Sequence, residues 1–199
     1  DGAHAVGMVP VDISDFECDF YTSSCHKWLL SPKGVGMAYI PESLESIRPA
    51  TLGFNLNQHG SATRFDVAGT KDSTHFAGLG TAIDFQEEIG WAEKIRPYCL
   101  GLANYLKSQV LEKISTANLT IPIDTEQSGF MTTFTIPGID HGKVASYLWQ
   151  DYQIESASVQ AGNKTVLRIS THFYNNYDDI DKFISALVNI LNTRTDIKK

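Results

Sequence analysis

The chain has 199 residues, 42% of them hydrophobic and 20% charged, which is typical of a globular protein with one large core or two modest ones. Its formal net charge is −7, so its overall field repels polyanions and we expect no nucleic-acid partner. No apolar run approaches the roughly 20 residues that span a bilayer, so we expect no membrane partner.

The cysteines favour a reducing compartment. Cys18, Cys25 and Cys99 are odd in number and lack a C-x-x-C spacing, which argues against a disulfide framework and a structural zinc site. We therefore expect reduced thiols and a cytoplasmic location. The first residues lack the basic start and long apolar core of a secretion signal. The chain opens on Asp1 without an initiator Met, so we expect a piece of a longer polypeptide.

The first part of the chain predicts short strands, a loop and a helix. Residues 20–22 and 35–40 are β-prone runs, and Pro41 closes the second. Residues 49–70 carry the glycines and asparagines of a long loop, which in a compact domain is usually functional or mobile. From Ser73 onward, apolar residues recur at steps of three and four and predict a helix.

A second helical pattern marks the expected domain boundary. It runs from Trp91 to Ile114, and Pro97 must kink it or begin a new helix. We expect residues 1–95 in one domain and residues 96–199 in a small α/β domain, because the rest of the chain alternates between strand and helix patterns.

The second half ends in the clearest pattern of the chain. Strands are predicted at 130–136 and 166–171, with a helix at 144–152 between them. In the last helix, Asp178 and Asp179 occupy the first turn, where negative charge is favourable to the helix dipole. Its predicted apolar face consists of Ile180, Phe183, Ile184, Leu187, Val188 and Leu191.

The densest group of reactive side chains follows the first predicted strand. In open α/β sheets, ligands bind beyond the carboxyl ends of strands. A lysine there becomes a nucleophile toward carbonyls in a desolvated or positively charged setting, which neighbouring aromatic and imidazole groups supply. The alternative from these residues alone is a surface lysine in a loop. The group is Ser23, Ser24, Cys25, His26, Lys27 and Trp28.

Asp1 adds a second candidate for the same site. It precedes a Gly-Ala-His turn, upstream of Lys27 by one connecting segment and a strand. A buried carboxylate that faces a heteroaromatic nitrogen keeps it protonated, and a protonated pyridine ring is an electron sink. Asp1 and Lys27 would bracket such a ring. The alternative is a simple turn, because Asp-Gly is a frequent turn dipeptide.

Two further residues could bind anions. Strand alternation places Arg168 on the face opposite Leu167 and Ile169, away from the core of the small domain, and a guanidinium binds carboxylates in a bidentate manner. The alternative is a solvated edge arginine paired with an acid. Thr70 offers a hydroxyl near a helix start, where phosphates often bind, although an ordinary helix cap explains it equally well.

Taken together, these segments resemble the class V aminotransferase family of enzymes that depend on pyridoxal 5′-phosphate (PLP). They lie in family order and cover nearly the whole chain, and the first two are most similar to the isopenicillin N epimerase-like branch, which includes cysteine-type C–S lyases. The segments are Asp1-Gly2-Ala3-His4-Ala5, Ser24-Cys25-His26-Lys27-Trp28 with Pro32-Lys33-Gly34, Gly69-Thr70-Lys71-Asp72 with Ala82-Ile83-Asp84-Phe85, and Arg168-Ile169-Ser170 with Tyr174-Asn175 and Asp179-Ile180-Asp181.

The resemblance implies fold type I. The chain would form the second half of the large PLP-binding domain, a mostly parallel sheet with helices, followed by a small C-terminal α/β domain. Lys27 would form the internal aldimine and later act as the base at the substrate Cα. Asp1 would hold the pyridinium nitrogen, and His4 would lie near the phenolic oxygen of the ring.

The remaining implied roles concern phosphate, substrate and partner. Ser24 and His26 would approach the phosphate, and Arg168 would bind the α-carboxylate of an amino-acid substrate. Thr70 would reach the phosphate of a neighbouring subunit, because sites in this family are shared across a homodimer.

The chain departs from the family pattern in two ways. The earlier half of the family, with its first phosphate-binding turn, is absent, so we expect no complete site from these residues alone. Cysteine desulfurases place a persulfide-forming Cys on a loop before the substrate arginine, whereas residues 156–163 contain none and Cys25 adjoins the lysine instead. We favour C–S cleavage or epimerisation over transamination. The open alternatives are a dimerisation module without catalysis and a generic anion-binding domain.

Overall fold

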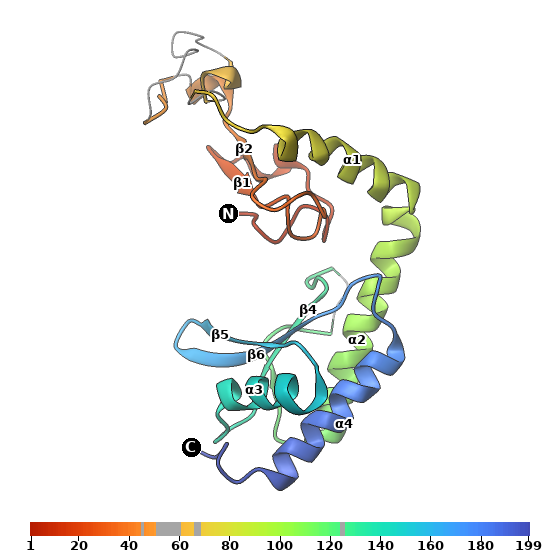
Figure 1. Cartoon of the computed structure of the whole chain (residues 1–199). Coiled ribbons are helices and arrows are strands. Elements are labelled where there is room, and N and C mark those ends of the chain that lie inside the picture. The colour runs from red at the N-terminus through yellow and green to blue at the C-terminus, as the bar shows by residue number, and fades with distance from the viewer. Residues whose placement is uncertain (45, 51–60, 66–68, 124–125) are drawn as a thin grey trace. The chain divides into compact units, whose positions relative to one another are not determined.

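The computed structural model of the chain describes residues 1–44, 46–50, 61–65, 69–123 and 126–199. These form two compact units, Asp1–Trp91 and Ala92–Lys199 (Figure 1). The division lies a few residues before the expected boundary at 95–96. Whether the units are the large-domain part and the small domain of the family stays a prediction.

The first unit contains two short strands, one long helix and many turns. β1 (Tyr21–Ser23) and β2 (Met37–Tyr39) confirm the two expected strands. α1 (Thr74–Glu88) confirms the expected helix. Residues 51–60 and 66–68 of the expected loop lie outside the described residues. Three 3-10 helices complete the unit, η1 (Ile13–Phe16), η2 (Glu42–Leu44) and η3 (Ala62–Phe65).

The second unit alternates helices and strands, as its sequence pattern predicts. A π-helical turn, η4 (Trp91–Ile95), begins at the last residue of the first unit and leads into α2 (Arg96–Lys113). Pro97 lies in the first turn of α2, where its missing N–H costs nothing, so it begins a new helix. The other elements are β3 (Asn118–Leu119), β4 (Met131–Thr135), α3 (His141–Tyr152), β5 (Ala157–Ala161), β6 (Lys164–Ser170) and α4 (Tyr177–Thr193).

The expectation of a mostly parallel sheet is wrong for the described residues. β1 pairs with β2, and the second sheet has the order β3-β4-β6-β5, with every pair antiparallel. Parallel neighbours need a crossover of a dozen or more residues, usually a helix. Turns join β1 to β2, and β5 connects to β6 through a tight turn at Gly162, whose φ is +60°. β5 was also missed, because its residues resemble a loop.

One face of the four-stranded sheet carries the core of the second unit. Phe134 of β4 pairs with Leu167 of β6, and both side chains are fully buried. Helices α2, α3 and α4 (Figure 1) supply most of the other members of this cluster, including Leu102, Leu106, Val144, Leu148, Ile184 and Leu187. Apolar side chains that alternate along the strands share one face of the sheet, and amphipathic helices bury that face in a stable two-layer architecture.

α4 confirms the strongest sequence pattern. Asn176 caps the helix, and the side chain of Asp179 closes a capping box by accepting from the Asn176 N–H at 3.1 Å. Of the predicted face, Val188 and Leu191 lie only partly buried at its margin. None of the helices in the described part of the chain has the length and apolarity to cross a membrane.

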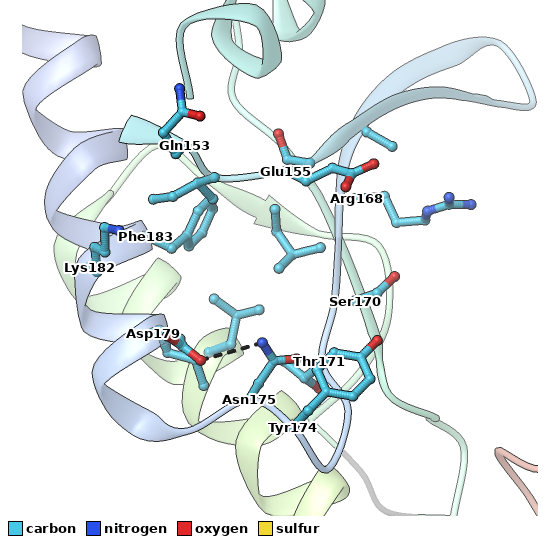
Figure 2. A pocket seen from close by; sticks show the side chains of 16 residues that line it. Gln153, Glu155, Arg168, Ser170, Thr171, Tyr174, Asn175, Asp179, Lys182 and Phe183 are labelled. Carbon is cyan, nitrogen blue, oxygen red and sulfur yellow. Dashed lines mark hydrogen bonds between the residues drawn. The ribbon is translucent and has the colours of Figure 1, made fainter. Parts of the chain in front are cut away.

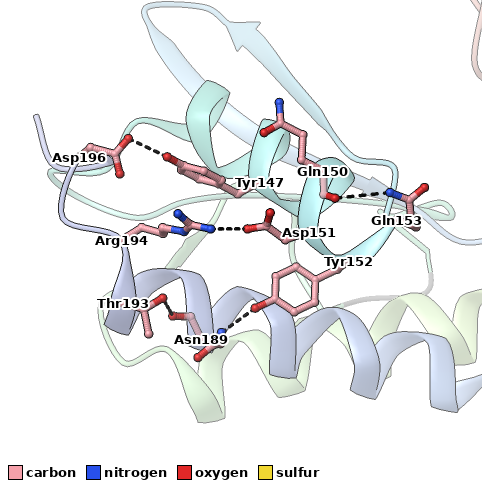
Figure 3. Close-up of polar contacts among 9 residues, drawn as sticks. All are labelled: Tyr147, Gln150, Asp151, Tyr152, Gln153, Asn189, Thr193, Arg194 and Asp196. Atoms are coloured by element: carbon pink, nitrogen blue, oxygen red, sulfur yellow. Dashed lines mark hydrogen bonds and ion pairs between the residues drawn. The ribbon is translucent and has the colours of Figure 1, made fainter.

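Polar contacts tie the end of α4 to α3 (Figure 3). Arg194 forms an ion pair with Asp151 at 2.6 Å, and its guanidinium lies 4.3 Å from the ring centroid of Tyr147. The Tyr147 hydroxyl donates to Asp196 Oδ2 at 2.9 Å, and this hydrogen bond raises the pKa of Tyr147. The charged groups Asp151, Arg194 and Asp196 are exposed, so each contact contributes little stability on its own.

Candidate functional site

The first residues of the chain are held directly against β1. Gly2 N donates to Thr22 O at 2.7 Å, and Ser23 Oγ donates to Gly2 O at 2.9 Å. A Cβ on Gly2 would lie 1.9 Å from Tyr21 Oη, so a larger residue does not fit at this position. The requirement for close approach explains the glycine after Asp1.

A tight turn at residues 24–31 presents Lys27 beyond the end of β1. Lys27 N donates to Ser24 O at 3.2 Å, and Ser31 N donates to Cys25 O at 3.2 Å. Lys27 is half-buried, whereas the thiol-bearing side chain of Cys25 is only 1% exposed. The chain therefore places an amine at the surface of a compact turn, as expected for the carboxyl end of a strand.

The imidazole of His26 is fixed by the same turn. Its Nδ1 lies 2.9 Å from Val35 O, and because a carbonyl oxygen only accepts, Nδ1 carries the hydrogen in this contact. Nε2 is therefore the nitrogen with which this exposed ring can meet a ligand.

His4 lies between Lys27 and Trp28. Lys27 Nζ is 3.2 Å from His4 Nε2, and Trp28 Nε1 donates to His4 Nδ1 at 3.0 Å. The structure thus brings together two of the predicted site residues, Lys27 and His4, from segments separated by more than twenty positions. The tryptophan, which the sequence suggested only as an enclosing group, is a direct hydrogen-bond partner.

Two further hydrogen bonds connect distant segments of the first unit, and the sequence did not indicate them. Gln86 is buried on α1 and donates through Nε2 to Trp28 O at 3.1 Å. Trp91 donates through Nε1 to Gly7 O at 2.8 Å. The contacts join residues 58 and 84 positions apart, so local spacing does not reveal them. The one local signal is that Gln86 follows the buried Ala82 by one helical turn.

Asp1 and Thr70 are both exposed. The Asp1 carboxylate accepts from Ala3 N at 2.8 Å and closes a turn, in agreement with the turn interpretation. Thr70 is not the cap of α1, because Asp72 accepts from Thr74 N at 2.8 Å at that helix start. The hydrogen bonds from the hydroxyl and N–H of Thr74 lower the pKa of Asp72.

The Cys25 thiol and the Tyr21 hydroxyl are buried near the turn at residues 24–31, and burial keeps both in their uncharged, less reactive form. Burial raises the pKa of the Cys25 thiol, so this side chain is a poor nucleophile at neutral pH. The Tyr21 hydroxyl lies beneath Gly2 without a hydrogen-bond partner among the described residues, and burial raises its pKa. All three cysteines, including Cys18 and Cys99, have free thiols.

Arg168 belongs to the second unit and lines a cavity of about 470 Å³ (Figure 2). It lies opposite Thr133 of β4 and Ala157 of β5, so β6 is an inner strand and the edge-arginine interpretation is wrong. Figure 2 shows Arg168 and Glu155 at one margin of the cavity. Among the described residues, Arg168 forms no ion pair within 4.0 Å.

Comparison with known proteins gives matches over nearly the whole chain. The aminotransferase class-V family model matches residues 1–183. Isopenicillin N epimerase from Streptomyces clavuligerus is 33% identical over 204 residues, which cover 94% of this chain and 51% of that protein. A cysteine desulfurase from Yersinia pseudotuberculosis is 30% identical over 214 residues, which cover 96% and 50%. The chain therefore spans about half the length of the curated relatives it matches.

Solved structures show a similar mixed α/β fold. The apo structure of a cysteine desulfurase from Thermococcus onnurineus NA1 has a TM-score of 0.82 at 23% identity and covers 96% of this chain and 52% of that one. The cystine C–S lyase C-DES, in complex with cysteine persulfide, has a TM-score of 0.78 at 24% identity and covers 95% and 51%. A variant of C-DES carries glycine covalently linked to its PLP cofactor.

Proposed function

The chain belongs to the class-V aminotransferase family, and from that premise we propose that it is part of a PLP-dependent enzyme that acts at Cα or Cβ of an amino acid. The observation that carries this proposal is the contact of 3.2 Å between Lys27 Nζ and His4 Nε2. A primary amine held against an imidazole at the end of a strand is equipped to attack a carbonyl carbon and to exchange protons.

The donor set fits PLP. The Lys27 amine suits its carbonyl group, the His4 imidazole suits the oxygen beside that carbonyl, and the exposed Asp1 carboxylate suits the ring nitrogen. The hydroxyl of Ser24 and Nε2 of His26 suit the phosphate. When bound, PLP supplies an electron sink for the electron pair left at the substrate Cα.

The chain supplies proton transfer and orientation. Lys27 Nζ would remove or return the proton at Cα, because it is the amine that would hold the carbonyl group of the cofactor. His26 would meet a phosphate oxygen through Nε2, since Nδ1 is already committed to Val35 O. Asp1 would pair with the ring nitrogen through its carboxylate.

Substrate and partner contacts complete the proposal. Arg168 binds the α-carboxylate of the substrate with two parallel N–H donors. Thr70, exposed before α1, reaches the phosphate bound by a neighbouring copy in a homodimer. A lysine at position 168 would offer only a point charge, so Arg168→Lys is expected to raise KM for the amino acid more than it lowers kcat.

C–S bond cleavage and epimerisation are the reactions we favour. The curated relatives include isopenicillin N epimerase and cysteine desulfurases, and C-DES is a cystine C–S lyase. Residues 156–163 contain no cysteine, and Cys25 is buried with a raised pKa. Residues 156–163 therefore offer no thiol that could carry sulfur, and the Cys25 thiol is poorly suited to do so. This favours direct release of a sulfur product.

Cofactor uptake is tested with the chain and whatever flanking sequence its natural polypeptide carries. Addition of PLP is expected to produce an absorption band of covalently bound cofactor, which is lost in Lys27→Ala. Lys33→Ala is the matched control, because Lys33 is an exposed lysine in the same loop region. A band that survives in Lys27→Ala contradicts the lysine assignment.

The reaction is tested by incubating the PLP-loaded protein with L-cysteine. Pyruvate together with sulfide supports a lyase. Exchange of the Cα hydrogen with solvent, without these products, supports an epimerase. An oxo acid that retains the sulfur supports transamination and contradicts both favoured reactions.

A further inference from the structure

A chain of hydrogen bonds leads from α1 to the amine of Lys27. Gln86 Nε2 donates to Trp28 O at 3.1 Å, Trp28 Nε1 donates to His4 Nδ1 at 3.0 Å, and His4 Nε2 lies 3.2 Å from Lys27 Nζ. We propose that Trp28 is a positioning residue that holds His4 as its Nε2–H tautomer, with that hydrogen directed at the Lys27 nitrogen.

The tautomer follows from what each group can donate. An indole N–H is a donor only, so His4 Nδ1 must accept and therefore carries no hydrogen. A neutral imidazole then has its hydrogen on Nε2. A charged ring is excluded by the same contact, because it would place a second donor 3.0 Å from the Trp28 donor.

This assignment has a consequence for the contact with Lys27. With the hydrogen on His4 Nε2, the imidazole presents a donor, and not a lone pair, on the side that faces Lys27 Nζ at 3.2 Å. His4 can therefore donate to an oxygen of a ligand held by Lys27, and it cannot accept a hydrogen bond through Nε2.

The indole is held firmly enough to select one tautomer. Trp28 is 7% exposed, and its backbone carbonyl is fixed by the buried Gln86. Its ring lies 6.3 Å from the His4 ring, between centroids, at an angle of 59°. Trp28, which directly follows Lys27, is therefore connected to His4 by an indole N–H hydrogen bond, a donor that phenylalanine and leucine lack.

The inference deepens the proposed function and rests on it only for the ligand oxygen that His4 would meet. The tautomer itself needs no cofactor. If the chain shows the tautomer but the protein with its flanking sequence takes up no PLP, the proposed function is refuted and the inference stands, whereas the opposite result refutes the inference alone.

The closing experiment is a long-range ¹H–¹⁵N correlation spectrum of the 199-residue chain with ¹⁵N-labelled histidine, near neutral pH and without PLP. The His4 signals are identified by their loss in His4→Gln. We expect an unprotonated Nδ1 and a protonated Nε2. A His4 ring with hydrogen on Nδ1, or on both nitrogens, overturns the proposal without the need for a Trp28 variant.

Two variants then separate positioning from general support. In Trp28→Phe we expect averaged ¹⁵N shifts of the His4 ring from a mixture of tautomers. The matched control is Trp91→Phe, which removes an indole donor to Gly7 O in the same unit and should leave the His4 shifts unchanged. Unchanged His4 shifts in folded Trp28→Phe contradict the proposal.

Discussion

The two compact units are stabilised in different ways. The second unit has a continuous apolar core, in which Phe134, Leu167 and Leu187 are fully buried between one sheet face and three helices. In the first unit, the described buried side chains are few and scattered, and polar contacts from Gln86 and Trp91 to backbone carbonyls connect its distant segments.

This difference teaches where stability and chemistry reside in the chain. Apolar packing is non-directional and contributes most to the free energy of folding. Hydrogen bonds contribute less net stability but set direction and protonation. The unit with the larger core therefore serves as scaffold for Arg168, whereas the unit with directional contacts holds the proposed reactive amine of Lys27.

The largest expected effect on stability comes from truncation of a core side chain in the second unit. Leu187→Ala on α4 removes a fully buried side chain and should lower the free energy of unfolding by about 2–5 kcal/mol, because it leaves a cavity. The matched control is Leu111→Ala on α2, where the side chain is 43% exposed and the expected loss is below about 1 kcal/mol. Urea denaturation measures both, and equal losses would contradict the packing difference.

The next effect concerns backbone fit in the first unit. A Cβ on Gly7 would lie 2.4 Å from backbone atoms of Trp28 and Leu29, at a φ of +85°. Gly34 has a similar φ of +89° but no atom within 4 Å of its Cβ position. We expect Gly34→Ala to cost about 1 kcal/mol and Gly7→Ala about 2 kcal/mol more. Tryptophan fluorescence during urea unfolding reports both, and similar costs would contradict the close approach.

Thiol labelling sharpens the comparison without changing a residue. Burial raises the pKa of Cys99 to about 11 and also raises that of Cys25, so at pH 8 fewer thiolates form than in the unfolded chain. Cys18 is partly exposed and should react first in the native chain. As urea increases, we expect Cys25 of the first unit to become reactive before Cys99. Labelling in the reverse order would refute the stability difference.

The smallest effect is a pH dependence at the start of α3. The backbone N–H groups of Lys143 and Gly142 lower the pKa of Asp140 below its ordinary value of 3.8. When the pKa of a carboxyl group is lower in the folded than in the unfolded state, its charged form stabilises the fold at pH values above the unfolded-state pKa. This stabilisation is lost as the pH falls through the folded-state pKa. Asp140→Asn keeps a capping oxygen without charge, so it should be less stable than the native chain at pH 6, and this difference should shrink as the pH falls below 3.8, the ordinary pKa of the carboxyl group. A difference that persists at low pH would contradict this origin.

Much of the second unit was predictable from its sequence. In α4, the acids of the first turn and the apolar residues at steps of three and four agree, and the helix lies where they place it. In α1 the steps also predicted the helix, but the structure leaves Phe76 and Ile83 about 40% exposed and buries Ala82 and Gln86. Periodicity shows which residues share a face, and it does not show which face is covered.

The site was predictable in part. The motifs indicated the family correctly, and the structure brings His4 and Lys27 together. The hydrogen bonds of Trp28, Gln86 and Trp91 depend on tertiary packing between distant segments, so spacing alone could not reveal them. The antiparallel sheets were mispredicted because strand pairing depends on connections that strand patterns do not specify.

The central claim is that Lys27 carries the cofactor. Borohydride reduction of the PLP-loaded protein, followed by proteolysis and mass spectrometry, maps the attached pyridoxyl group to a single peptide. We expect the label on Lys27 and on no other lysine, including Lys33 in the same loop region. A label on another residue, or a protein that retains none after reduction, contradicts it.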